Sequence, residues 1–159
     1  MVELLIALAI AGMLLAALTV ALNASIVNYR ENEEIFKGIN SARQALTRMT
    51  SEIRTAGADV NGIFLSVDPC APSNQCNLYT ANGESITYEF RSPDPNLYLI
   101  TNSNGNEYVL CDNVVSATFT KTPADSDNSK SVQIVLTVQS GNHQQNLAAA
   151  AVVRKVLDR

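Results

Sequence analysis

The feature that most limits how this chain can fold is an uncharged apolar stretch at its start. Between Leu4 and Leu22 there are 19 residues without an ionisable side chain, and only Gly12 and Thr19 interrupt the apolar residues. A helix of about 20 apolar residues, rising about 1.5 Å per residue, spans the core of a bilayer. Glu3 lies at the edge of this stretch, where a carboxylate is costly unless a cation pairs with it. Residues 1–22 are therefore expected to lie in a membrane or among other apolar helices.

A cleaved signal peptide is the first alternative for such a stretch. Signal peptides carry basic residues before the apolar core and a small-residue cleavage site after it. Here the residue before the core is acidic, and the first basic residue is Arg30. We therefore expect the apolar segment to be retained.

Residues 23–57 keep a helix-forming composition but become amphipathic. No proline occurs before Pro69, so nothing forces a break in the helix. Apolar residues recur at alternating steps of four and three, at Ile35, Ile39, Ala42, Leu46, Met49, Ile53 and Ala56. This spacing gives a helix with one apolar face, with Gly57 expected as its C-terminal cap. The face is predicted to pack on a folded body; a two-helix coiled coil is the alternative.

The remainder of the chain has the pattern of short strands separated by turns. Asn82-Gly83 and Asn104-Gly105 each separate two apolar runs, which indicates two β-hairpins. We predict strands over residues 62–67, 77–81, 84–91, 97–101, 107–111, 114–121 and 131–139. The tail, residues 147–157, contains four alanines that favour helix and three valines that favour strand; strand is preferred here.

These elements predict an α+β fold, in which one long N-terminal helix packs on a mostly antiparallel β-sheet head. We divide the chain into a transmembrane or filament-core helix over residues 1–22, its amphipathic continuation over 23–57 and a β-rich head over 58–159. A chain of 159 residues is long enough for one modest domain and a helical extension.

Charge and motifs argue against several functional classes. The net charge is −4, and the sequence has no basic cluster, which argues against nucleic-acid binding by the monomer. The sequence has no recognisable catalytic triad, phosphate-binding loop or cofactor motif. We therefore expect neither an enzyme nor a cofactor.

Cysteine and acidic residues supply two weaker predictions. Export behind an apolar anchor would favour disulfides, and Cys70 and Cys76 are the nearest pair, with Cys111 free or an alternative partner. A third reading leaves all three cysteines as small buried residues. Asp125, Asp127 and Asn128 lie in one polar loop and form a weak calcium candidate, although a solvated loop without metal is the favoured reading. His143 is expected to be exposed.

The first fifteen residues, MVELLIALAIAGMLL, resemble the N-terminal segment of type IV pilins and pseudopilins. Residues 40–56, NSARQALTRMTSEIRTA, and residues 108–119, YVLCDNVVSATF, are similar to minor pilins and J-type pseudopilins. The resemblance implies that a leader peptide and a methylated phenylalanine precede Met1. Gly12 matches the family's helix glycine, whereas Val20 stands where many major pilins have proline.

The resemblance implies a role and a location. In this family the carboxylate that Glu3 matches meets the N-terminal amine of a neighbouring subunit, so Glu3 and Gly12 become assembly residues. We expect a structural subunit of a bacterial type IV pilus-like filament. Its partners are copies of itself and other pilins or pseudopilins. It resides in the inner membrane before assembly and in an extracellular filament, or a periplasmic pseudopilus, afterwards. The alternatives are a minor pseudopilin of a type II secretion pseudopilus and a membrane-anchored binding or adhesin domain.

Overall fold

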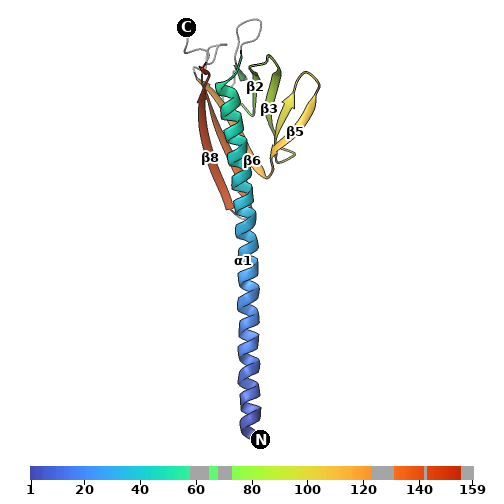
Figure 1. Ribbon diagram of the computed structural model, residues 1–159, viewed down its shortest axis with the longest axis vertical. Helices are drawn as coiled ribbons and strands as arrows, with labels where there is room; N and C mark the ends of the chain where they lie inside the picture. Colours follow the sequence, from blue (N-terminus) through green and yellow to red (C-terminus); the bar gives the residue numbers. More distant parts are fainter. Residues whose placement is uncertain (58–64, 68–72, 123–130, 142, 155–159) are drawn as a thin grey trace. The chain divides into compact units, whose positions relative to one another are not determined.

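The computed structural model describes residues 1–57, 65–67, 73–122, 131–141 and 143–154. Within them, a single helix precedes all the strands (Figure 1). The elements are α1 (Val2–Arg54), β1 (Leu65–Val67), β2 (Gln75–Tyr79), β3 (Ser85–Arg91), β4 (Asn96–Thr101), β5 (Asn106–Cys111), β6 (Val114–Thr122), β7 (Ser131–Ser140) and β8 (His143–Val152). The predicted α+β class is confirmed.

The strands form two antiparallel sheets, where the sequence suggested a single one. The first sheet has the order β1-β2-β3-β4-β5, and the second has the order β6-β7-β8. Consecutive strands are hydrogen-bonded neighbours throughout both sheets. The division falls between β5 and β6, where Asn113 adopts a positive φ of 54°. Asparagine tolerates this left-handed conformation better than most residues, and it lets the chain leave the first sheet.

The chain divides into two compact units, Met1–Phe36 and Lys37–Arg159. The first unit is the N-terminal part of α1, and the second contains the rest of α1 and both sheets. The boundary that we predicted after residue 22 marks a change of environment along the helix. This boundary stays a prediction, because the division after Phe36 reflects contacts within the chain and does not test which part of the helix lies in lipid or in a filament core.

Within the second unit, the apolar face of α1 packs into the core as predicted. Ala42, Leu46, Met49 and Ile53 are buried, and Ile39 is half-buried. The periodic pattern missed Ala45, which is 3% exposed and lies on the same face. Alanine is small enough to be found on either side of a helix, so its burial had no clear signal. Ile35 belongs to the first unit and is also half-buried.

One core cluster joins this helix face to both sheets. The inward side chains alternate along the strands as the sequence predicted, with Ile86, Tyr88 and Phe90 buried on β3 and Val132, Ile134, Leu136 and Val138 buried on β7. Alternation places every second side chain on the core face of a strand. The largest fully buried side chains are Tyr88 and Phe119, one from each sheet.

The two Asn-Gly pairs form the predicted turns. Gly83 has a φ of 81°, and Gly105 has a φ of 69°. These positive values are easily adopted by glycine, which has no Cβ. The turns connect β2 to β3 and β4 to β5, and they set the register of the polar residues described below.

Gly57 has a different role from the predicted helix cap. α1 ends at Arg54 in a tightened turn, in which the Ala56 amide donates to the Ile53 carbonyl at 3.2 Å. Gly57 lacks a positive φ, and its amide donates to the Tyr79 carbonyl at 2.8 Å. A Cβ at this position would lie 2.8 Å from the Thr80 carbonyl oxygen. Glycine is therefore needed for close approach to β2.

The tail forms a strand, as preferred from the sequence, but with different bounds. β8 begins at His143, before the predicted start at residue 147, and ends at Val152. The first four residues of β8 are polar and exposed on both faces, so they lack the alternation that reveals a strand. Residues 155–157 of the predicted tail strand lie outside the described residues.

Candidate functional site

Residues 1–22 of the first unit carry a surface made almost entirely of apolar side chains. Leu4, Leu8, Met13 and Val20 are each more than 70% exposed. α1 is long and apolar enough to cross a membrane, by length and composition, and the most apolar window of it has none of its residues buried in the structure. Soluble proteins rarely leave such a continuous apolar surface in water. This surface therefore requires lipid or other protein around it.

Glu3 and Gly12, the two predicted assembly residues, both belong to this exposed helix. Glu3 lies in the first turn of α1, where a carboxylate interacts favourably with the helix dipole. Apart from the adjacent residues and the backbone of its own helix, no heavy atom among the described residues would come within 4 Å of a Cβ at Gly12. Gly12 is thus an open notch on the surface of the helix, and the assembly role of both residues stays a prediction.

In the second unit, a polar contact joins α1 to the centre of the first sheet. The Tyr88 hydroxyl on β3 donates a hydrogen bond to the Glu52 carboxylate. The other Glu52 oxygen accepts from Arg48 Nε at 3.0 Å, a pairing that side chains four residues apart on a helix commonly make. Burial, followed by the hydrogen bond to Glu52, raises the pKa of Tyr88 far above its usual value. Both Glu52 oxygens have partners, so this carboxylate fixes the helix on the sheet.

A groove of about 560 Å³ opens beside this contact. Arg48 and Glu52 line one side, and Leu99, Tyr108 and Val109 contribute from the strands. The charged pair is already mutually satisfied, and Tyr108 and Val109 are more than half exposed. The groove combines this apolar contact area with a polar lining that includes Glu84, whose carboxylate accepts from the Ser103 hydroxyl at 3.3 Å.

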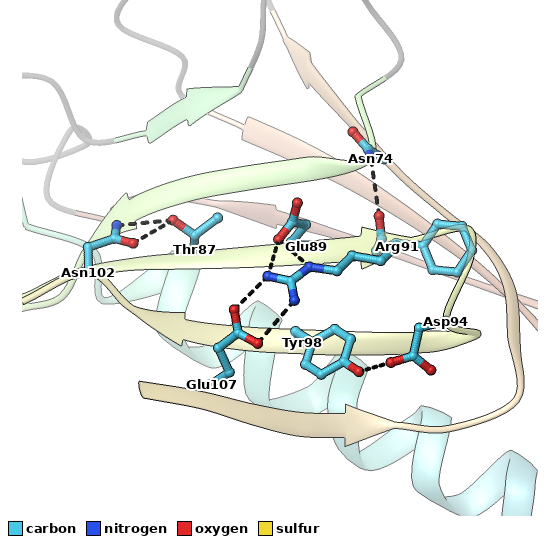
Figure 2. Close-up of polar contacts among 9 residues, drawn as sticks. Asn74, Thr87, Glu89, Arg91, Asp94, Tyr98, Asn102 and Glu107 are labelled. Atoms are coloured by element: carbon cyan, nitrogen blue, oxygen red, sulfur yellow. Dashed lines mark hydrogen bonds and ion pairs between the residues drawn. The ribbon is translucent and has the colours of Figure 1, made fainter. Parts of the chain in front are cut away.

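The face of the first sheet that points away from the core carries a polar cluster of Thr87, Glu89, Arg91, Asp94, Tyr98, Asn102 and Glu107, shown with Asn74 in Figure 2. Arg91 is at its centre. Its Nη1 and Nη2 donate to the two Glu107 oxygens at 3.0 and 2.6 Å, and its Nε donates to Glu89 at 2.9 Å. Its guanidinium also lies 4.8 Å from the centre of the Tyr98 ring, within the range of a cation–π contact.

The charges in the cluster stabilise one another. The hydrogen bond with Arg91 lowers the pKa of Glu107 below its ordinary value of 4.5. The hydrogen bonds that Arg91 donates to Glu107 and then to Glu89 raise the pKa of Arg91. At the edges of the cluster, the Tyr98 hydroxyl donates to Asp94, and Thr87 pairs with Asn102 at 3.0–3.1 Å. A fork of this kind holds a planar guanidinium in one orientation, which favours a fixed surface over proton transfer.

Sequence reasoning missed this cluster, although one signal was present. Glu89 and Arg91 lie two residues apart on one strand and therefore share a face. Glu107 is sixteen residues from Arg91, and only the pairing of β3 with β4 and of β4 with β5 brings the two together. The hairpin turns predicted which strands are neighbours, but the contact of Arg91 with Glu107 runs diagonally across β4 and depends on the register of both strand pairs.

Two of the three cysteines are described. Cys76 and Cys111 are free thiols buried in the core, so they are not bonded to each other. The predicted bond from Cys70 to Cys76 stays a prediction, because Cys70 lies outside the described residues. Cys76 points inward on β2 among apolar side chains, and burial raises its pKa to about 12. For these two cysteines the structure agrees with the third reading, that of small buried residues.

The remaining candidates add no site within the described residues. Asp125, Asp127 and Asn128, the calcium candidate, fall outside them. Among the residues that are described, no group of three or more metal-ligating side chains comes together. His143 is exposed at the start of β8, as predicted.

A scan against protein-family models and a search of curated proteins find no match to this chain. The resemblance to pilins therefore depends on the residues quoted above. The structure has a long apolar N-terminal helix followed by antiparallel sheets. This arrangement is compatible with a pilin-like fold and with membrane anchoring.

Proposed function

We propose that this chain is a structural subunit of a type IV pilus-like filament and polymerises through residues 1–22. The observation that carries the proposal is the exposed apolar surface of residues 1–22 of α1. Burying one large apolar side chain contributes about 1.5–3 kcal/mol. Outside a membrane, neighbouring copies of the same helix can bury this surface. Before assembly, a bilayer would serve the same purpose.

The composition of the helix supports association with other helices. Small residues let two helix backbones approach closely, and they recur along the segment at Ala7, Ala9, Ala11, Gly12, Ala16 and Ala17. Bulky leucines and isoleucines between them would fill the spaces between neighbours. An ordinary lipid anchor needs only hydrophobicity and has no need of this alternation.

Glu3 gives the proposal its specific assembly contact. In an apolar bundle a carboxylate needs a cationic partner, and leaving one charge of a buried pair without its partner costs about 3–5 kcal/mol. The pilin resemblance implies that the partner is the N-terminal amine of an adjacent subunit. Glu3 would then select the axial offset between neighbours, because only one offset brings the two charges together.

The test is filament formation by the native protein in its own cells, with Glu3→Ala compared with Glu31→Ala. Glu31 is exposed on the same helix but lies outside the apolar segment. The proposal predicts that Glu3→Ala inserts into the membrane but yields no filaments in electron micrographs, whereas Glu31→Ala assembles normally. Unchanged filaments from Glu3→Ala would contradict the assembly contact.

The same preparations separate the two alternatives. A minor pseudopilin would be recovered at a few copies per filament, or in a complex with other pilin-like chains. A monomeric anchored adhesin would show the same surface display and no self-association in both variants. A filament composed of one repeated chain mass supports the major structural role.

A further inference from the structure

The two sheets have four edge strands in the described part of the chain, namely β1, β5, β6 and β8. An edge strand presents unpaired backbone N–H and C=O groups that can bind another strand. Natural proteins usually protect such edges by making them short, or with bulges, charged side chains or covering segments. Comparing the four edges therefore shows which of them is left open for a partner.

Three of the edges carry protection. β1 is three residues long. β5 is irregular, because its register shifts between Leu97 and Tyr98, and it presents the charged Glu107. β6 has a register shift between Val114 and Ser116, and it carries the buried Lys121. Ser73 also pairs with β6 through two backbone hydrogen bonds to Phe119, at 2.8 and 3.1 Å.

β8 carries none of these devices. All ten of its residues pair with β7, without a shift in register. Between residues 131 and 153 there is no Asp, Glu, Lys, Arg or Pro. Among the described residues, no bridge or backbone hydrogen bond reaches the other side of β8. It is a long, regular and uncharged edge, with the features that favour strand addition.

The sequence of β8 is complementary to itself when two copies run antiparallel. Its first half has long polar side chains and its second half has alanines, HQQN-L-AAAA-V. Residues directly opposite each other in an antiparallel pair point to the same face of the sheet. A two-fold axis between two copies of β8 must therefore lie midway between one residue and its own copy. With the axis at Leu147, the cross-strand pairs are Asn146 with Ala148, Gln145 with Ala149, Gln144 with Ala150 and His143 with Ala151.

This register brings each long side chain opposite a methyl group. Ala148 and Ala150 are exposed on the outward face, so the stems of Asn146 and Gln144 from the second copy have room to lie over them. The two copies of Leu147, each half-buried, meet at the axis. An unrelated strand would meet these constraints only by coincidence, whereas a second copy of β8 meets them by symmetry.

We propose that the β8 edge binds the β8 edge of a second copy of this chain, antiparallel and centred on Leu147. The two three-stranded sheets then form one continuous six-stranded sheet. The proposal uses contacts within Lys37–Arg159 only and does not depend on filament formation. It adds a second self-association surface, distinct from the apolar helix.

The test is site-directed disulfide formation in the full chain, purified in detergent. Leu147→Cys should cross-link to itself, because it meets its own copy at the axis. Asn146→Cys alone and Ala148→Cys alone should form no disulfide-linked dimer, whereas a mixture of the two variants should form one. Directly opposite Cβ atoms lie about 4.5–5.5 Å apart, and the wider and closer pairs alternate along the ladder. One of the two adjacent pairs, Leu147 with its own copy or Asn146 with Ala148, is therefore the closer kind, which suits a disulfide. At least one of the two tests should therefore give a dimer.

Controls separate this register from random collision. The wild-type chain, treated identically, measures cross-linking through the native cysteines, and peptide mapping identifies the joined positions. A mixture of Gln144→Cys with Ala148→Cys places the thiols two residues out of register and should give no dimer. Circular dichroism checks that each variant is folded. The proposal would be overturned if neither Leu147→Cys nor the mixture of Asn146→Cys with Ala148→Cys formed a disulfide-linked dimer. Equal cross-linking in the out-of-register mixture would also overturn it.

Discussion

The hydroxyl of Tyr88, at the centre of the first sheet, donates a hydrogen bond to the carboxylate of Glu52 on helix α1. The two residues are 36 positions apart in the sequence. Tyr88 is fully buried, and Glu52 also accepts from Arg48 at the surface of the helix. The contact therefore fixes the rotation of α1 on the sheet, in addition to the apolar face that buries Met49 and Ile53.

Replacing Tyr88 with Phe removes this hydrogen bond and keeps the ring. Hydrogen bonds to charged groups contribute about 1.5–3 kcal/mol, so we expect Tyr88→Phe to lower the free energy of unfolding of the second unit by about 2 kcal/mol. Chemical denaturation in detergent measures this. Tyr108→Phe is the matched control, because Tyr108 is 53% exposed, and it should stay within about 0.5 kcal/mol of wild type. Equal stability of both variants would show that the bond is unimportant.

Gly57→Ala should destabilise the second unit by about 1–3 kcal/mol, the usual cost of overpacking. The added Cβ meets the backbone carbonyl of Thr80 at 2.8 Å, which cannot move without disturbing β2. Gly38→Ala gives a control of opposite sign, since its Cβ would lie at an ordinary 3.9 Å from Ser140. In the middle of a helix this change should stabilise by about 0.5–1 kcal/mol. Melting temperatures of the two variants should move in opposite directions from wild type.

Alkaline conditions should weaken the fold through Cys76. Burial raises its pKa from an ordinary 9.0 to about 12, so folding holds the neutral thiol. The corresponding stability is fully present below pH 9.0 and is lost as the pH rises toward 12. We expect the free energy of unfolding of wild type to fall between these values more steeply than that of Cys76→Ala. Parallel pH profiles for the two proteins would contradict this.

Acidic conditions should weaken the polar cluster through Glu107, whose pKa is lowered by Arg91. A carboxylate with a lowered pKa contributes stability above its ordinary value of 4.5, and this stability is lost as the pH falls through the folded value. The NMR titration of Glu107 should therefore have its midpoint below 4.5. In Arg91→Gln the midpoint should return toward the ordinary value. A midpoint that is the same in both proteins would show that the fork does not persist in solution.

The elements that the sequence predicted best are those with a regular pattern and one clear environment. The stripe from Ala42 to Ile53 and the alternation on β7 both describe one buried face, and the hydrophobic effect enforces such a face over several turns or pairs. The two Asn-Gly turns were equally clear, because few dipeptides accept positive φ.

The sequence was less informative where partners are distant or side chains are ambiguous. The Arg91–Glu107 pair depends on the registers of two strand pairs, and neither register is visible in a single segment. The polar start of β8 had no alternation, because its side chains are exposed on both faces. Gly57 looked like a helix cap, although the requirement for glycine comes from Thr80, which is 23 residues further along the chain.

The most direct test of the filament proposal is a helical reconstruction by electron microscopy of the native assembly. The account predicts that residues 4–22 of each subunit are surrounded by the same residues of neighbouring copies, with Glu3 beside the N-terminal amine of an adjacent chain. The β-rich units should form the outer surface. A native assembly in which this segment contacts only lipid or detergent, or in which the chain occurs at a few copies among other subunits, would contradict the proposal.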